Sequence, residues 1–309
     1  MLSVKTVAVI GAGLVGEGWA ARFLSAGLNV KLYDVSQAKR HAATTTIKSL
    51  LSDLHAHGLS NHPDTVIARL HVVDTLEQAV KQCDYVQESV LEKIGVKTSV
   101  CAQISAALPD HSLVGSSSSG IPVSAFTEGL ANRQKFFIVH PVNPPHLVPV
   151  VEIVPAPWSD LAQIDPIKAL LERIGMAPIL VEKEIEGFVL NRLQGALLNE
   201  AWALYEAGYA SAEDIDKTVK HGLGRRWAFM GPFETIALNA PNGIADYAAR
   251  LSPLYHAVAT SRTNPEPWSL ETAARLDEEL KVNHNSENRA QRLKARDDML
   301  LQIAKLLSG

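Results

Sequence analysis

A histidine and a glutamate twelve residues apart are the side chains of this chain best suited to acid–base chemistry. His140 ends the apolar run 136–140, and Glu152 lies inside the next strand-like run, 150–154. A carboxylate in a buried strand is costly unless it is paired. If the two strands are neighbours, Glu152 can fix the tautomer of the His140 imidazole and make it a better base. The alternative is a core histidine bonded to a backbone carbonyl, with a glutamate that faces water.

Two further polar positions could bind the oxygen of a substrate. Ser119 closes a run of four serines, 116–119, that follows another strand-like segment. A polar loop explains that run equally well. Asn191 interrupts the apolar pattern of a helical segment, 187–207, and could donate to a substrate or cap a neighbouring turn.

The most specific motif is a glycine-rich turn between the first strand-like run, 4–10, and a helical segment. Gly11 permits the tight turn, Gly13 lets the backbone approach a pyrophosphate, and Gly16 lets the helix lie close to the strand. The free N–H groups at the start of this helix would then bind the pyrophosphate. The residues expected to bind it are Gly11, Gly13, Leu14, Val15 and Gly16.

An acidic residue follows the second strand-like run, 29–33. Asp34 comes 18 residues after Gly16, where a carboxylate accepts hydrogen bonds from ribose hydroxyls and repels a 2′-phosphate. The pattern therefore predicts NAD rather than NADP as the cofactor, although Lys39 and Arg40 lie just beyond Asp34.

Length and composition narrow the function classes. The length of 309 residues predicts two domains, and the apolar content of 47% predicts a substantial core. The formal net charge of −4 argues against nucleic acid and membrane partners. The first strand begins almost at Met1, and no apolar run is long enough to span a bilayer. Cys83 and Cys101 form no Cys-x-x-Cys pair, so we expect reduced thiols in a cytoplasmic protein without a metal site.

Strand-like runs alternate with helical segments through the first part of the chain, which predicts an α/β fold with a Rossmann-type, mainly parallel sheet. The expected strands are 4–10, 29–33, 70–73, 85–90, 113–116, 136–140, 150–154 and 179–181. Residues 36–68 predict a helical hairpin that projects from the sheet, with a helix over 37–57, a turn over 58–63 and a second helix.

After Lys183 the pattern is almost entirely helical. We therefore predict an NAD-binding domain over 1–184 and an all-helical domain over 185–309 for substrate binding and dimerisation. Ser211 and Asp214 are typical of a helix start, and that helix is expected to end around Gly222 and Gly224. Another helix should begin at Pro232, and 288–307 should form a charged amphipathic helix. The aliphatic content of this domain predicts a face buried against a partner subunit.

Taken together, these motifs resemble the 3-hydroxyacyl-CoA dehydrogenase family over essentially the whole chain. Within it the sequence is most similar to the λ-crystallin branch, whose enzymatic member is L-gulonate 3-dehydrogenase. The stretches that carry the similarity to this branch are 140–145, 187–194, 200–202, 222–234 and 296–306.

The resemblance implies a role for each matched position. His140 would be the catalytic base, and Glu152 would orient it. The residues implied to bind the substrate are Ser119, Asn143 and Asn191, and those implied near the nicotinamide ribose are Glu92 and Lys97. The resemblance also implies a homodimer formed through the helical domain.

The identity of the substrate is what the sequence determines least. Between positions 41 and 65 the hairpin has one Lys or Arg, Lys48, which weakens the case for a phosphorylated CoA nucleotide without excluding it. Arg226 precedes a predicted helix and could clamp the carboxylate of a free hydroxy acid, or form a structural ion pair instead. We therefore expect an NAD-dependent dehydrogenase of a small 3-hydroxy acid, of L-gulonate type.

Three alternatives stay open. One is a 3-hydroxyacyl-CoA dehydrogenase. Another is a carnitine dehydrogenase, in which Trp227, Phe229 and Phe233 would surround the quaternary ammonium. The third is a non-catalytic, crystallin-like NAD-binding protein, against which the complete set of acid–base residues argues.

Overall fold

An eight-stranded sheet organises the first part of the chain in the computed structural model, which describes residues 4–261, 267–280 and 286–307. Across the sheet the strands run in the order β3-β2-β1-β4-β5-β6-β7-β8, and every neighbouring pair is parallel except β6 with β7. The strands are β1 (Thr6–Ile10), β2 (Asn29–Tyr33), β3 (Leu70–Val72), β4 (Tyr85–Glu88), β5 (Leu113–Ser116), β6 (Phe136–Pro141), β7 (Val150–Pro155) and β8 (Ala177–Leu180). The predicted mainly parallel, Rossmann-type sheet is thereby confirmed.

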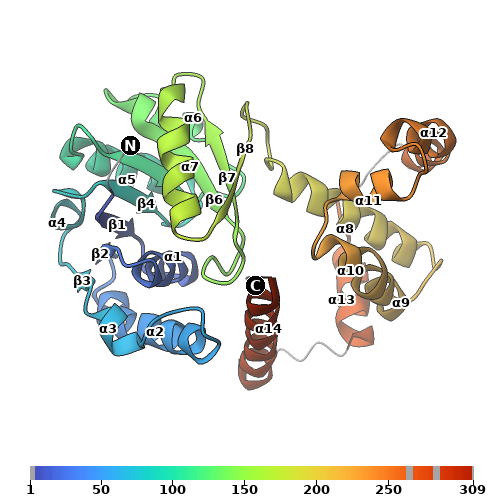
Figure 1. Ribbon diagram of the computed structural model, residues 1–309, viewed down its shortest axis with the longest axis horizontal. Helices are drawn as coiled ribbons and strands as arrows, with labels where there is room; N and C mark the ends of the chain where they lie inside the picture. The colour runs from blue at the N-terminus through green and yellow to red at the C-terminus, as the bar shows by residue number, and fades with distance from the viewer. Residues whose placement is uncertain (1–3, 262–266, 281–285, 308–309) are drawn as a thin grey trace. The chain divides into compact units, whose positions relative to one another are not determined.

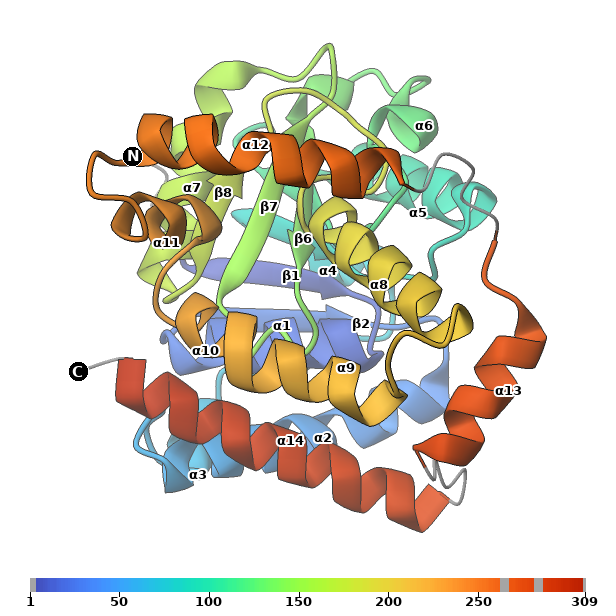
Figure 2. The same ribbon diagram turned by 90° about the vertical axis from the view of Figure 1, so that its right-hand side faces the viewer.

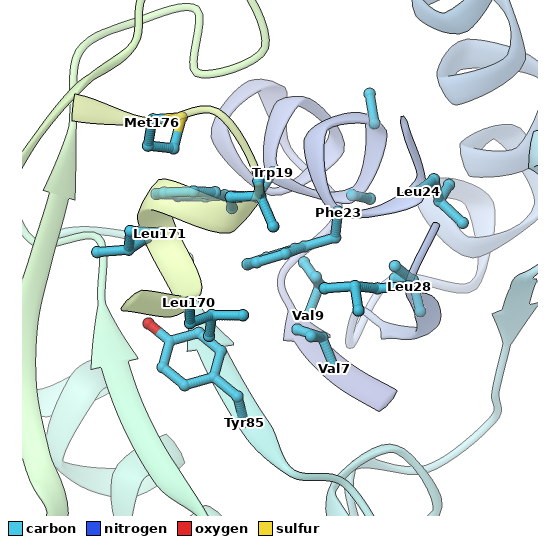
Figure 3. Packing of buried hydrophobic residues seen from close by; sticks show 14 of the residues in the cluster. Val7, Val9, Trp19, Phe23, Leu24, Leu28, Tyr85, Leu170, Leu171 and Met176 are labelled. Carbon is cyan, nitrogen blue, oxygen red and sulfur yellow. The ribbon is translucent and has the colours of Figure 1, made fainter. Parts of the chain in front are cut away.

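Helices cover both faces of the sheet (Figures 1 and 2), because alternate side chains of each strand point to opposite faces. Val7 and Val9 belong to one buried cluster, which is shown in Figure 3, and Ala8 and Ile10 belong to the other. The first cluster is closed by α1 (Leu14–Ser25), α2 (Gln37–Ala56), α3 (Pro63–Ile67) and α7 (Ile164–Arg173). The second is closed by α4 (Leu76–Val80), α5 (Ile94–Ala107) and α6 (Ser124–Thr127). Short 3-10 turns, η1 (Arg133–Lys135) and η2 (Leu161–Gln163), precede β6 and α7.

The predicted helical hairpin is present as α2 and α3, but it does not project freely from the sheet. Its residues Ala43, Ile47, Leu51 and Leu54 are buried in the same cluster as α1. They recur every three or four positions, so they form one apolar stripe, and burying that stripe holds the hairpin against the sheet layer.

The chain divides into two compact units: unit 1 comprises residues 1–192 and 295–309, and unit 2 comprises residues 193–294. The two units of the structure differ in two places from the division predicted at 184/185. The first turn of α8 belongs to unit 1, since its backbone binds Glu152 there. The end of the chain returns to unit 1, since Leu301 is buried in the sheet's first cluster.

The later helices are α8 (Leu190–Glu206), α9 (Ala212–Thr218), η3 (Val219–Leu223), α10 (Gly224–Trp227), α11 (Pro232–Leu238), α12 (Ile244–Thr260), α13 (Leu270–Glu279) and α14 (Ser286–Leu307). Ser211 caps α9 and Pro232 begins α11, as predicted. The expected helix end around Gly222 and Gly224 is wrong, because the π-helical turn η3 carries the helical path into α10. Within the described ranges, no helix has both the length and the apolar content needed to cross a membrane.

Candidate active site

The turn after β1 has the shape that a dinucleotide diphosphate requires. Gly11 has φ +110°, and a Cβ there would lie 2.5 Å from the carbonyl oxygen of Ser89. A Cβ on Gly16 would overlap the carbonyl oxygen of Gly11, whereas a Cβ on Gly13 would have nothing within 4 Å. The backbone is therefore open at Gly13, beside the first N–H groups of α1, which have no carbonyl partner inside their own helix.

A cavity of about 470 Å³ adjoins this turn. The predicted cofactor residues that line it are Gly11, Gly13, Leu14, Val15, Asp34, Glu92 and Lys97. Gly16 is buried behind the turn. One Asp34 carboxylate oxygen accepts a hydrogen bond from the Ala12 N–H and the other from the Ser36 N–H, both at 2.8 Å. These bonds hold the carboxylate at the end of β2, in the wall of the cavity.

The two basic residues after Asp34 are already engaged. Arg40 donates to the Asp34 carbonyl oxygen at 2.8 Å, lies over the Tyr33 ring, and comes within 3.6 Å of Asp74. Lys39 lies 4.0 Å from the Asp34 carboxylate. A 2′-phosphate would therefore meet a fixed negative charge and an arginine with other partners, which favours NAD.

The contact between His140 and Glu152 forms as the sequence predicts. His140 and Glu152 are directly opposite each other on the antiparallel strands β6 and β7, and His140 Nδ1 lies 2.7 Å from Glu152 Oε2. Both side chains are buried, with 7% and 1% of their surface exposed.

The second oxygen of Glu152 binds the start of α8. Glu152 Oε1 accepts from the N–H groups of Val189 and Leu190, at 2.8 and 2.9 Å. Burial raises the pKa of Glu152, but the bonds from His140, Leu190 and Val189 outweigh it, so the pKa is lowered overall. Glu152 is thus a carboxylate that holds both the imidazole and a helix terminus.

Ser119, Asn191 and Glu92 form a second connected group. Asn191 Nδ2 donates to the Ser119 carbonyl oxygen at 2.6 Å, and Ser119 Oγ bonds Glu92 Oε2 at 2.5 Å. Glu92 Oε1 also accepts from Ser118 Oγ and from the N–H groups of Ser119 and Gly120. Partial burial raises the Glu92 pKa, but these bonds lower it to about 2. Glu92 is therefore ionised, and the Ser119 hydroxyl must donate its proton to it.

These contacts tie the candidate catalytic residues of unit 1 into one frame. Glu152 binds the backbone at the start of α8, and Asn191, one residue further on, binds the Ser119 loop. Phe188 packs its buried ring 5.8 Å from the His140 ring, between centroids, with φ +49°. The start of α8 therefore holds both the Glu152 carboxylate and the Ser119 loop in place.

Three predicted residues have different surroundings. The Lys97 ammonium lies 3.0 Å from both Glu88 oxygens in a buried ion pair, so its charge is bound inside the cavity wall. Asn143 is exposed in the loop after β6. Arg226 belongs to unit 2, where it lies exposed in α10.

The sequence reasoning missed Glu88 and Ser89, and it named Ser117 only as a member of the serine run 116–119. All three lie at the carboxyl ends of β4 and β5, beside the point between β1 and β4 where the strand order reverses. That position is where open α/β sheets bind ligands, so the strand pattern could have drawn attention to them.

A Rossmann-type sheet with an open glycine turn, a fixed acidic residue after β2 and a buried His–Glu pair in the same unit is the arrangement of a dinucleotide-dependent oxidoreductase. Residues 6–185 match the NAD binding domain of 3-hydroxyacyl-CoA dehydrogenase, and residues 187–274 match the C-terminal domain of that enzyme. The chain belongs to the 3-hydroxyacyl-CoA dehydrogenase family, and NAD is its cofactor.

Full-length relatives support this assignment. The human lambda-crystallin homolog is 36% identical, over 98% of this chain and 96% of that protein. The L-carnitine dehydrogenase of Pseudomonas putida is 33% identical, over 97% of this chain and 93% of that enzyme. A solved structure of 5-formyl-3-hydroxy-2-methylpyridine 4-carboxylic acid 5-dehydrogenase, an NAD+ dependent dismutase, superposes with a TM-score of 0.87 at 28% identity, and covers 99% of each chain.

Proposed function

We propose that the protein oxidises the 3-hydroxyl of a small free hydroxy acid with NAD, in the manner of an L-gulonate 3-dehydrogenase. The observation that carries this proposal is the buried His140–Glu152 pair at 2.7 Å, in the same unit as the NAD cavity. The 36% identity with the human lambda-crystallin homolog supports the choice of branch.

The direction of proton transfer follows from the hydrogen bonds. NAD, when bound, accepts the hydride from the substrate carbon. Because Nδ1 of His140 faces the Glu152 carboxylate, its proton resides there and Nε2 is the free base that removes the hydroxyl proton. Glu152 then balances the charge of the imidazolium. In the reverse direction, His140 returns the proton to the oxygen.

Asn191 has an N–H available for the reacting oxygen, whereas the Ser119 hydroxyl proton is already in use. Ser119 directs its only hydroxyl proton to Glu92, so it offers lone pairs and no donor. Asn191 uses one N–H on Ser119, and its second amide N–H has no partner in the part of the chain that the structure describes. We therefore assign the donor role to Asn191.

The hairpin favours a free acid over an acyl-CoA. Lys48 is the single Lys or Arg between positions 41 and 65, and its ammonium lies 2.5 Å from the Asp64 carboxylate. The hairpin thus has no lysine or arginine left without a counter-ion for the phosphates of a CoA nucleotide.

A free acid needs a partner for its carboxylate, and we assign that role to Arg226. Its guanidinium is exposed and forms no ion pair with any residue that the structure describes. A planar two-donor fork suits a carboxylate. Carnitine is the second candidate, because Trp227, Phe229 and Phe233 present exposed rings that suit a quaternary ammonium, and a carnitine dehydrogenase is among the relatives.

An initial-rate screen at mildly alkaline pH tests the proposal, with NAD and either L-gulonate, L-carnitine, free 3-hydroxybutyrate or 3-hydroxybutyryl-CoA. We expect turnover of a free acid that is lost in His140→Ala, and a KM for that acid raised more than tenfold in Arg226→Ala but not in Arg225→Ala. Turnover of the CoA thioester alone would overturn the free-acid proposal. No turnover of any hydroxy compound, with NAD binding intact, would favour the crystallin-like alternative.

We also propose that two copies of the chain associate through unit 2. The support is the large apolar area that the described residues of this unit expose, including Tyr209, Phe233 and Leu238, each at least 70% exposed.

A further inference from the structure

A partly buried hydrogen-bond network borders the NAD cavity and joins α1, β4, β6 and the residue after β5. Gln87 of β4 receives a bond from the Tyr85 hydroxyl at 2.8 Å, and its amide nitrogen contacts Ser117 Oγ at 2.8 Å and the Val139 carbonyl oxygen at 3.3 Å. The indole nitrogen of Trp19, on α1, lies 3.1 Å from the same Ser117 Oγ, and Ser89 Oγ lies 2.9 Å from it. Trp19 and Tyr85 are both seen in Figure 3.

The donors of this network can be assigned from its fixed members. The Val139 carbonyl oxygen can only accept, so the Gln87 amide must turn its nitrogen toward Val139 and Ser117. The indole N–H of Trp19 can only donate. Ser117 Oγ therefore accepts two hydrogen bonds, one from Gln87 and one from Trp19.

This assignment determines where the proton of Ser89 goes. A hydroxyl has two lone pairs and one proton, and both lone pairs of Ser117 are in use. Ser117 must then donate its proton to Ser89 Oγ. The hydroxyl proton of Ser89 is left over, because Ser89 Oγ has no other hydrogen-bond partner among the residues that the structure describes.

Ser89 is placed where that proton meets the cofactor. It follows β4 directly and lines the NAD cavity together with Gly11 and Gly13. Its carbonyl oxygen lies under Gly11, and its Cβ would be 3.5 Å from a Cβ built on Gly16. The side chain thus packs against the glycine turn that faces the diphosphate.

We propose that the Ser89 hydroxyl donates a hydrogen bond to the diphosphate of bound NAD, and that the Gln87–Ser117 relay keeps it in the donor orientation. Ser89 then supplies a side-chain donor at a site otherwise built from backbone N–H groups. Because an anionic acceptor strengthens a hydrogen bond, the donor orientation matters most when the cofactor is present.

Direct titration of the purified chain with NAD, by calorimetry and without substrate, tests the proposal. We expect Ser89→Ala to raise the Kd of NAD about tenfold or more, which is the usual effect of losing a hydrogen bond to a charged group. Ser105→Ala is the matched control, because Ser105 bonds Asn132 and does not line the cavity. An unchanged Kd in Ser89→Ala, or an equal rise in Ser105→Ala, would overturn the proposal.

A double-mutant cycle tests the relay itself. Gln87→Met gives Ser117 a vacant lone pair, so Ser89 can turn its proton away from the cofactor, and we expect a smaller rise in Kd. That rise should vanish in the Ser89→Ala background. If Gln87→Met raises the Kd equally in the Ser89→Ala background, the relay is wrong. The role of Ser89 itself is still tested by the single variant Ser89→Ala.

Discussion

At the scale of single residues, Glu152 holds both the proposed catalytic base, His140, and the start of a helix. One of its oxygens fixes His140, and the other accepts from two N–H groups at the start of α8. A substitution can separate these two roles. Gln keeps a carbonyl oxygen for α8, whereas its amide nitrogen must face Nδ1 of His140 as a donor.

Glu152→Gln should therefore leave the fold intact and stop the reaction. A donor opposite Nδ1 places the imidazole proton on Nε2, the atom that we propose receives the substrate proton. We expect kcat to fall by about a thousandfold or more with little change in KM, as when a catalytic histidine is held in the wrong tautomer. Steady-state kinetics and the melting temperature are the measurements. A kcat within tenfold of the wild-type value would refute the assignment of Nε2 as the base.

His146 is a second buried histidine, with 6% of its surface exposed. Burial is the main cause that lowers its pKa, to about 4. Arg22 and Arg296 lower the pKa further, and Asp297 opposes them. Its Nδ1 has no hydrogen-bond partner among the described residues. His146 is therefore neutral in the folded chain at neutral pH.

The lowered pKa of His146 in the folded chain makes the stability of the protein sensitive to acid. An unfolded histidine has a pKa of about 6.5, so between that pH and about 4 the unfolded chain binds the extra proton and the folded chain does not. The free energy of unfolding should thus fall by about 3 kcal/mol across this window on account of His146. Urea unfolding of His146→Leu at several pH values should show a correspondingly flatter profile. If the free energy of unfolding changes equally with pH in the variant and the wild type, His146 is not the cause of the acid sensitivity.

At the scale of elements, strands were predicted better than helix ends. The apolar runs of β2 and β5 are bounded by turn residues, and the predicted bounds agree with the structure. Gly222 and Gly224 were misleading, because glycine ends a helix only where it adopts positive φ, and neither of them does. A sequence shows the glycine but not its conformation.

In the candidate site, too, the sequence predicts some contacts and not others. The His140–Glu152 contact could be predicted, because it depends on two adjacent strands and their register. The ion pair between Lys97 and Glu88 could not be predicted, and neither could the direction of the Ser89 hydroxyl proton. Each depends on which of several polar neighbours points inward from different elements, and no sequence spacing encodes that.

The last helix stabilises unit 1 through one deeply buried side chain. Leu301 of α14 is 1% exposed and belongs to the cluster beneath α1 and α2. Leu301→Ala should lower the free energy of unfolding by about 2–4 kcal/mol, whereas Leu306→Ala, at a position 79% exposed, should change it by less than about 0.5 kcal/mol. Urea denaturation distinguishes these outcomes. A loss of less than about 0.5 kcal/mol in Leu301→Ala would show that this contact contributes little to the stability of unit 1.

At the scale of the whole molecule, the two units differ in how well they bury apolar residues. Unit 1 has two extended buried clusters. Among the described residues of unit 2, Ala212 and Ala240 are the buried apolar ones, while Phe233 and Leu254 are 73% and 57% exposed. The fully buried apolar core of unit 2 is therefore small, and we expect its exposed apolar side chains to be covered by another protein surface. A second copy of the chain is always available at equal concentration.

We therefore expect a dimer whose stability depends on unit 2. Light scattering on a sizing column should give the mass of two chains at micromolar concentration, and the melting temperature should rise with protein concentration. Leu254→Asp, on α12, should weaken the dimer and lower the melting temperature, because it places a charge in an apolar contact. Leu161→Asp is the control, since Leu161 is equally apolar and 64% exposed but lies in unit 1. A monomeric wild type with a concentration-independent melting temperature would show that unit 2 is stable without a partner copy.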